Sequence, residues 1–143
     1  MQARTFRLIA LLTCLSIALP ALAMQFGYPL KGSWSGEYWL KKGDEQRVLL
    51  EFHWDGKAPS GMFNPGTDNA TLQKLTLNPP GGGVANAAAG WPLHFEFEAK
   101  DQAGRAVRHV VDGKLENIGA YNKFITGTWT VNGQKGEFKI VMN

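Results

Sequence analysis

The sequence of 143 residues contains a single cysteine, Cys14, which lies in the apolar stretch at the start of the chain. The rest of the chain therefore offers no thiol for a disulfide, a metal site or a nucleophile. It also lacks a Gly-x-Ser-x-Gly elbow and a glycine-rich loop with the Lys and Ser/Thr that phosphate binding needs. We therefore expect no enzyme, no catalytic residues and no cofactor.

A strong excess of charge is also absent. The chain has 15 basic and 12 acidic residues, and two of the basic ones, Arg4 and Arg7, lie in the segment that we expect to be removed. The remaining 13 basic residues give a net charge of only +1. A nearly neutral protein offers no electrostatic reason to bind nucleic acid or an anionic membrane, so we expect neither partner.

Residues 1–23 are predicted to be a signal peptide. Two arginines precede an apolar run, and Ala21-Leu22-Ala23 is typical of a cleavage site. The run is too short for a stable membrane span. Cleavage leaves residues 24–143, a single domain without cysteine, which fits a bacterial periplasmic or secreted protein. Whether Cys14 is ever lipidated stays open.

The remaining chain is rich in stretches that alternate between apolar and polar residues, as half-buried antiparallel strands do. The first two, 30–41 and 47–55, are joined by a short polar turn and predict a hairpin. Asn132-Gly133 is the strongest hairpin signal in the chain. The other predicted strands are 60–64, 70–77, 91–100, 105–112, 122–131 and 134–142.

Three segments have more than one interpretation. Residues 71–77 fit a strand, with a short surface helix as the alternative. Asp112-Gly113 fits a tight hairpin or a bulge, with residues 115–118 as a further short strand after it. Residues 78–90, with two prolines and three consecutive glycines, are expected to form a long irregular loop.

About eight strands, regular turns and no convincing amphipathic helix predict an all-β fold, a single antiparallel meander closed into a barrel. First and last strands are neighbours in such a barrel, so Gly32-Ser33-Trp34 and the similar Gly127-Thr128-Trp129 could pair. A barrel of this size holds side chains or one small ligand.

A Gly-x-Trp unit on the first strand of an exported meander, here Gly32-Ser33-Trp34, resembles the calycin group of lipocalins and avidins. The resemblance implies a carrier with a small ligand inside the barrel. The chain departs from lipocalins, because no C-terminal helix is predicted, and from avidins, because Ser35-Gly36-Glu37-Tyr38 follows the tryptophan. Biotin binding is therefore not implied. The chain also resembles bacterial exported barrels, some of them fused to hydrolases as accessory domains.

Two sets of polar residues have the composition of a metal site or of a catalytic site. His53, His94 and His109 are all expected on outward faces, where they are more readily explained as surface histidines than as a metal site. His94, Glu96 and Glu98 alternate on one strand. Two outward glutamates at this spacing are typical of a solvated strand face rather than of a pair of catalytic carboxylates.

The aromatic residues are the most informative feature of the composition, with five tryptophans in the chain. Trp39 and Tyr121 are candidates for an outward patch that marks a partner surface. We expect non-enzymatic binding of a small apolar or amphipathic ligand inside the barrel, with a protein-interaction or envelope-associated module with a filled core as the alternative. The predicted ligand-binding residues are Trp34, Phe52, Trp54, Phe95 and Trp129.

Overall fold

The computed structural model describes residues 28–66, 68–80 and 89–143. The predicted signal peptide and most of the glycine-rich loop lie outside these residues. All the described secondary structure is β-sheet, which confirms the all-β prediction. The strands are β1 (Gly32–Trp39), β2 (Glu45–Trp54), β3 (Pro59–Phe63), β4 (Ala70–Thr71), β5 (Gln73–Leu77), β6 (Trp91–Lys100), β7 (Ala106–Glu116), β8 (Phe124–Val131) and β9 (Gln134–Met142).

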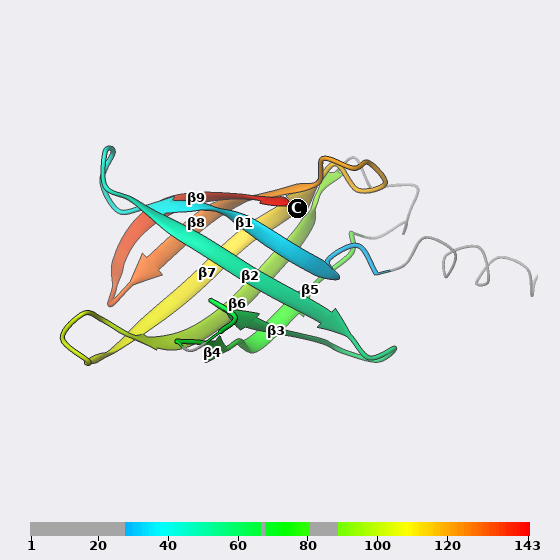
Figure 1. Ribbon diagram of the computed structural model, residues 1–143. Helices are drawn as coiled ribbons and strands as arrows, with labels where there is room; N and C mark the ends of the chain where they lie inside the picture. Colours follow the sequence, from blue (N-terminus) through cyan, green and yellow to red (C-terminus); the bar gives the residue numbers. More distant parts are fainter. Residues whose placement is uncertain (1–27, 67, 81–88) are drawn as a thin grey trace, which may run out of the picture.

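The nine strands form one antiparallel sheet in the order β4-β3-β2-β1-β9-β8-β7-β6-β5, which curls into a nearly closed barrel (Figure 1). The first and last strands pair, as predicted for a closed meander. The two edge strands, β4 and β5, follow each other in sequence and are joined through Leu72. This side chain is buried, and its N–H donates to the carbonyl oxygen of Gly61 at 3.0 Å. The architecture is compatible with a calycin-like barrel.

Alternation along the strands sorts the side chains as expected, with one face inside the barrel and the other outside. The first strand places Trp34 in the interior, and the sixth places Phe95 and Phe97 there, all with no exposed surface. The interior contains sixteen buried hydrophobic side chains: Leu30, Trp34, Val48, Leu50, Phe52, Ala70, Leu72, Leu93, Phe95, Phe97, Val111, Leu115, Ile125, Trp129, Phe138 and Ile140.

Glycine allows neighbouring strands to approach closely at several places in the barrel wall, of which Gly36 and Gly127 are examples. A Cβ atom on Gly36 would lie 2.1 Å from the carbonyl oxygen of Lys139 on β9. A Cβ atom on Gly127 would lie 2.1 Å from the carbonyl oxygen of Asp112 on β7. Only glycine fits such a contact, and it lets a strongly curved sheet bend.

Residues 70–77 form β4, Leu72 and β5, which confirms the predicted strand and not the alternative surface helix. Two other sequence expectations need correction. Asp112-Gly113 is neither a hairpin nor a bulge, because β7 runs straight through it and pairs in unbroken register with β6 and β8. Residues 115 and 116 end that same strand, so no separate strand follows there. Gly113 is needed for packing, since an added Cβ would lie 2.8 Å from the Phe138 ring.

The two Gly-x-Trp units do not pair. Trp34 on β1 lies opposite Leu50 and Met142, whereas Trp129 on β8 lies opposite Val111 and Gly136. Strand β9 separates the two units, because β9 and not β8 is the last strand of the meander. Both tryptophans nevertheless point into the interior.

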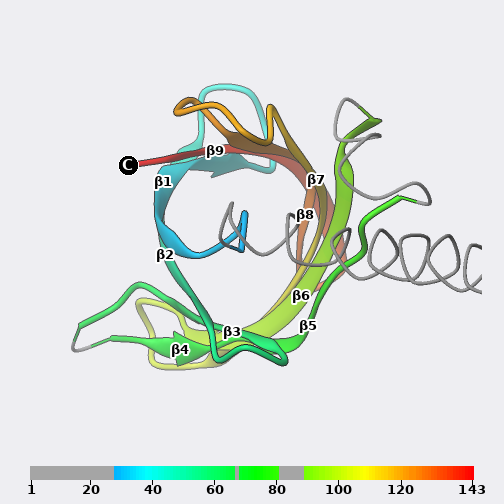
Figure 2. The ribbon, with the colours of Figure 1, turned by 90° about the vertical axis from the view of Figure 1, so that its right-hand side faces the viewer.

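One end of the barrel is filled by the segment before β1. Figure 2 shows this segment bending into the opening of the ring. Leu30 is completely buried and its carbonyl oxygen accepts a 2.8 Å hydrogen bond from Nε1 of Trp34. Tyr28 stacks on Trp54 with ring centroids 4.1 Å apart, and Lys123 donates to the carbonyl oxygen of Pro29 at 2.8 Å. We call residues 28–30 the N-terminal plug.

Candidate binding site

Four of the five predicted ligand-binding residues lie together in the interior. Ring centroids are 6.4 Å apart between Trp34 and Phe52, 6.0 Å between Phe52 and Phe95, and 6.1 Å between Phe95 and Trp129. All three pairs meet edge to face, the usual geometry of aromatic rings in contact. The four rings therefore pack against one another in a chain of edge-to-face contacts.

The fifth predicted residue, Trp54, lies apart from this group. It is half-buried at the plugged end, where Tyr28 covers its face in a nearly parallel stack. The stacking partner precedes the first strand, so strand patterns could not predict it. The structure thus brings four of the five aromatic residues together and places Trp54 against the N-terminal plug.

His109 is inside the barrel, which corrects the expectation of an outward side chain. It is 6% exposed and lies in an aromatic box made by Tyr38, Phe63, Phe97 and Trp129. The Phe97 ring stacks on the imidazole with centroids 4.5 Å apart. Nε1 of Trp129 donates to Nδ1 of His109 at 3.0 Å, so the imidazole is neutral and carries its proton on Nε2. Burial lowers the pKa of His109 to about 4.

The other two histidines face outward as predicted. His53 lies near Glu51, with Nε2 3.5 Å from a carboxylate oxygen. Nδ1 of His94 lies 2.7 Å from Oδ1 of Asp112. Among the residues that the structure describes, no three His, Cys, Asp or Glu side chains form a cluster that could hold a metal ion.

The outer face of β5–β7 carries a network of charges that neutralise one another. Lys74 lies 2.9 Å from the carboxylate of Glu96, and Arg108 also pairs with that carboxylate. The hydrogen bond from Lys74, together with the Arg108 charge, lowers the pKa of Glu96. Sequence reasoning treated Glu96 as a solvated residue like Glu98, but its side chain is only 11% exposed. A carboxylate paired with cations on both neighbouring strands stabilises the sheet and is a poor proton donor or acceptor.

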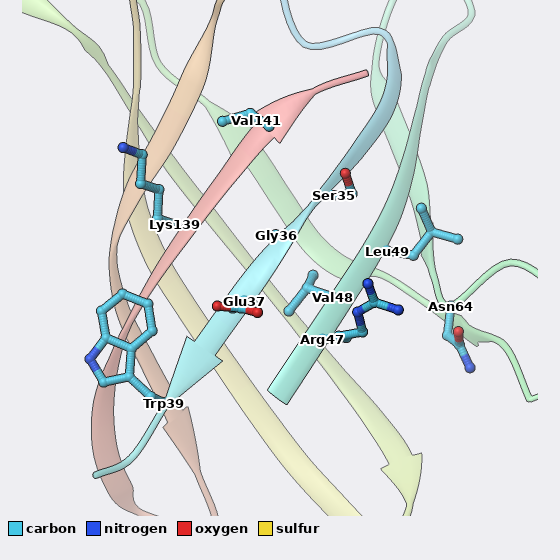
Figure 3. Close-up of a pocket in the computed structure, with 10 residues that line it drawn as sticks. All are labelled: Ser35, Gly36, Glu37, Trp39, Arg47, Val48, Leu49, Asn64, Lys139 and Val141. Atoms are coloured by element: carbon cyan, nitrogen blue, oxygen red, sulfur yellow. The ribbon is translucent and has the colours of Figure 1, made fainter. Parts of the chain in front are cut away.

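A groove of about 780 Å³ crosses the outer face of β1, β2 and β9 (Figure 3). Its lining combines one aromatic ring, exposed aliphatic side chains and three charged groups. Leu49 is 39% and Val141 42% exposed, which is high for large apolar residues. The lining residues are Ser35, Gly36, Glu37, Trp39, Arg47, Val48, Leu49, Asn64, Lys139 and Val141.

Strand register arranges the groove in parallel rows. Val141, Ser35 and Leu49 are direct neighbours on β9, β1 and β2 and form an aliphatic row with a small polar centre. Two residues further along each strand, the next outward row contains Lys139, Glu37 and Arg47. Figure 3 shows both rows crossing the three strands, with Trp39 beyond the charged row.

The charges of this groove differ from those on β5–β7 because they are not engaged. In the described ranges 28–66, 68–80 and 89–143, no ion pair involves Glu37, Arg47 or Lys139. The Lys139 ammonium lies 5.7 Å from the centroid of the Phe124 ring. The groove therefore keeps Glu37 and Arg47 outside these ion pairs beside an exposed apolar surface, while Lys139 lies over the Phe124 ring.

A second hollow, of about 820 Å³, lies between the β3–β4 turn and the β6–β7 hairpin. Phe63, Ala99 and Ala106 are its apolar lining, and apart from Gly104 the rest is polar. The Asp101 carboxylate, which lines it, is occupied within its own turn by the backbone N–H groups of Ala103 and Arg105 and by the Arg105 side chain. The groups around this hollow mainly stabilise the hairpin.

The sequence indicated part of the outer groove. Trp39 was predicted to be outward, and it is half-buried on the outer face. Tyr121, the other predicted patch residue, is fully exposed but is not among the groove residues. Leu49 and Val141 were missed, because they are far apart in sequence and become neighbours of Ser35 only through the pairing of β1 with both β2 and β9.

Comparisons with protein-family models, with curated proteins and with solved structures gave no match for this chain. In the part of the chain that the structure describes, no helix is long and apolar enough to cross a membrane.

Proposed function

We propose that the protein is an exported, non-enzymatic binding module that holds its partner in the outer groove over β1, β2 and β9. The observation that carries this proposal is the aliphatic row of Val141, Ser35 and Leu49 beside a row of unengaged charges. Exposed apolar area bordered by polar groups is typical of binding surfaces. Its position on paired strands gives the groove a rigid base.

The packing inside the barrel supports the same proposal. The rings of Trp34, Phe52, Phe95 and Trp129 contact one another, which favours an interior packed with the protein's own side chains. Most of the described charged groups on β5–β7 also pair among themselves. The outer groove combines exposed apolar surface with charged groups that form no ion pair among the described residues.

A small apolar or amphipathic ligand inside the barrel remains a second candidate function. The observation that favours it is the half-burial of Tyr38 and Phe63, at the end opposite the N-terminal plug. Tyr38 stacks on Trp129 at 4.7 Å and Phe63 on Phe97 at 4.5 Å. A ligand would have to displace one of these rings to reach His109.

The two candidate functions predict different results in one binding experiment. The wild-type protein, the groove variant Leu49→Asp/Val141→Asp and the control Thr71→Asp/Gln102→Asp are immobilised and exposed to the host's periplasm and envelope fragments. The control has the same charge change at exposed positions outside the groove. We expect the wild type and the control to retain the same material, and the groove variant to lose it.

Equal retention by the groove variant would contradict the proposal. Native mass spectrometry of the wild type and the groove variant, purified from the host, tests the second candidate directly. A small-molecule mass that both proteins carry and that denaturation releases would place the ligand inside the barrel instead. Circular dichroism of each variant checks that the sheet is intact.

A further inference from the structure

The size and shape of the groove limit what it can hold. A volume of about 780 Å³ lies within the range of sites for small ligands, roughly 300–1,000 Å³. The groove lies across three strands rather than inside a closed cavity, so a chain-like ligand could extend beyond it at both ends. The groove is therefore large enough for a small molecule or for a few units of a chain-like ligand.

The charges of the groove favour an uncharged occupant. Glu37 is the direct neighbour of Arg47 on one side and of Lys139 on the other. Side chains directly opposite each other in antiparallel strands have Cβ atoms about 5 Å apart. An anionic ligand drawn to the two cations would be repelled by Glu37, and a cationic ligand drawn to Glu37 would be repelled by both cations. A neutral ligand with many hydroxyl groups can donate to the carboxylate and accept from both cations.

Trp39 adds a flat apolar surface beside these polar groups. Figure 3 shows its indole with the flat face turned toward the viewer, beyond Glu37 on the same strand. Asn64 lies at the other side of the groove, next to Leu49, whose carbonyl oxygen accepts a 2.8 Å hydrogen bond from the Asn64 N–H. Its side-chain amide donates to the carbonyl oxygen of Asp68 at 3.4 Å, and its Oδ1 lines the groove as an acceptor. One aromatic face in the same groove as a carboxylate, a guanidinium group and an amide oxygen matches one ligand chemistry well.

That chemistry is the pyranose ring, which has C–H groups on its faces and hydroxyl groups around its rim. The C–H groups pack on an aromatic face, and the hydroxyls bind to planar polar side chains. We infer that the outer groove binds an uncharged oligosaccharide, with a sugar ring on Trp39 and its hydroxyls on Glu37 and Arg47. The inference rests on the proposed function and names the ligand class of the same groove.

The experiment uses chitohexaose and cellohexaose, two uncharged probes, and a heparin-derived hexasaccharide as the anionic comparison. Binding is measured by calorimetry and by amide chemical shifts of the mature protein. We expect an uncharged probe to bind and to shift the amides of Ser35, Glu37 and Leu49. Trp39→Ala should weaken this binding at least about tenfold, whereas Trp39→Tyr, which keeps an aromatic face, should retain most of it.

Salt provides a second readout. Binding of an uncharged sugar should be almost insensitive to ionic strength, because no net charge is neutralised. Binding of only the heparin-derived probe, weakened by salt and by Lys139→Gln, would overturn the inference in favour of an anionic ligand. Absence of any shift with both uncharged probes would overturn it as well.

These failures are distinguishable from failure of the proposed function. Suppose that no uncharged probe binds, but the groove variant Leu49→Asp/Val141→Asp fails to retain the envelope material that the wild type retains. The groove is then a binding site for another class of ligand. If the groove variant retains the same material as the wild type, the groove is not the binding site and both proposals fall. A probe that binds but shifts amides elsewhere, with Trp39→Ala unaffected, would also overturn the inference.

Discussion

The indole N–H of Trp129 donates a hydrogen bond to Nδ1 of His109 in the interior of the barrel. This contact lets a polar imidazole lie among aromatic rings, because a buried acceptor with a partner costs far less than one without. The imidazole is held in the neutral form, and its burial lowers its pKa to about 4.

His109 makes the stability of the barrel depend on pH. Its pKa is about 4 in the folded protein and 6.5 in the ordinary, unfolded state. Its contribution is therefore complete above pH 6.5 and is lost as the pH falls from 6.5 toward 4, because the unfolded chain binds the proton more readily. The loss is on the order of 2–3 kcal/mol, and urea unfolding at a series of pH values measures it.

His109→Gln keeps an acceptor for Trp129 but cannot titrate, so its unfolding free energy should change less over the same pH range. His53→Gln is the matched control, since this exposed histidine should leave the wild-type slope in place. A slope for His109→Gln as steep as that of the wild type would show that other groups cause the pH dependence.

Phe95 tests whether the interior is filled. Phe95→Ala removes a completely buried ring that contacts Phe52 and Trp129, and it should lower the free energy of unfolding by about 3–5 kcal/mol. Val141→Ala on the outer face should cost at most about 0.5 kcal/mol. Denaturant unfolding of both variants checks this, and a small effect of Phe95→Ala would indicate an interior that is not tightly packed.

Gly36 tests the close approach of β1 and β9. Gly36→Ala would place a methyl group 2.1 Å from the carbonyl oxygen of Lys139, so the two strands must move apart. We expect a loss of about 2–3 kcal/mol or more and faster amide exchange along the β1–β9 pair. Ser35→Ala, the neighbouring outward position, should cost about 0.5 kcal/mol. Equal stability of the two variants would mean that the barrel wall adjusts easily.

Glu96 tests the charge network on β5–β7. Glu96→Gln leaves Lys74 and Arg108 without their shared carboxylate and should lower the thermal midpoint more than Glu98→Gln, whose side chain is 57% exposed. The pKa of Glu96 is lowered from 4.5, so its contribution is present above pH 4.5 and is lost as the pH falls below that value. The two variants should therefore converge in stability in acid, and a difference that persists there would contradict the assignment.

Much of the fold could be predicted from alternation alone, because each strand has one apolar face and the barrel has one interior. The same rule placed Val107, His109 and Val111 on one face, but the polar nature of histidine led to the wrong side. His109 can be buried because Trp129 on the adjacent strand donates a hydrogen bond to its imidazole. The sequence of one strand does not show which side chains lie on the neighbouring strand.

The outer groove could not be predicted for a related reason. Alternation identifies Ser35, Leu49 and Val141 as outward residues, but only the register of three strands makes them one row. Register between β1 and β9 is set by residues about a hundred positions apart. Patterns within one strand contain no information about such a pairing.

The pairing of β1 with β9 also has a kinetic consequence. Neighbouring hairpins such as β1–β2, β6–β7 and β8–β9 can form from local contacts, but the β1–β9 ladder joins segments such as Trp34 and Met142 across almost the whole folded chain. Closing so long a loop is entropically costly and slows folding. A ribosome or translocation channel that still held β9 would therefore keep the barrel open, with the interior rings of β1 and β8 accessible to chaperones until the final strand was released.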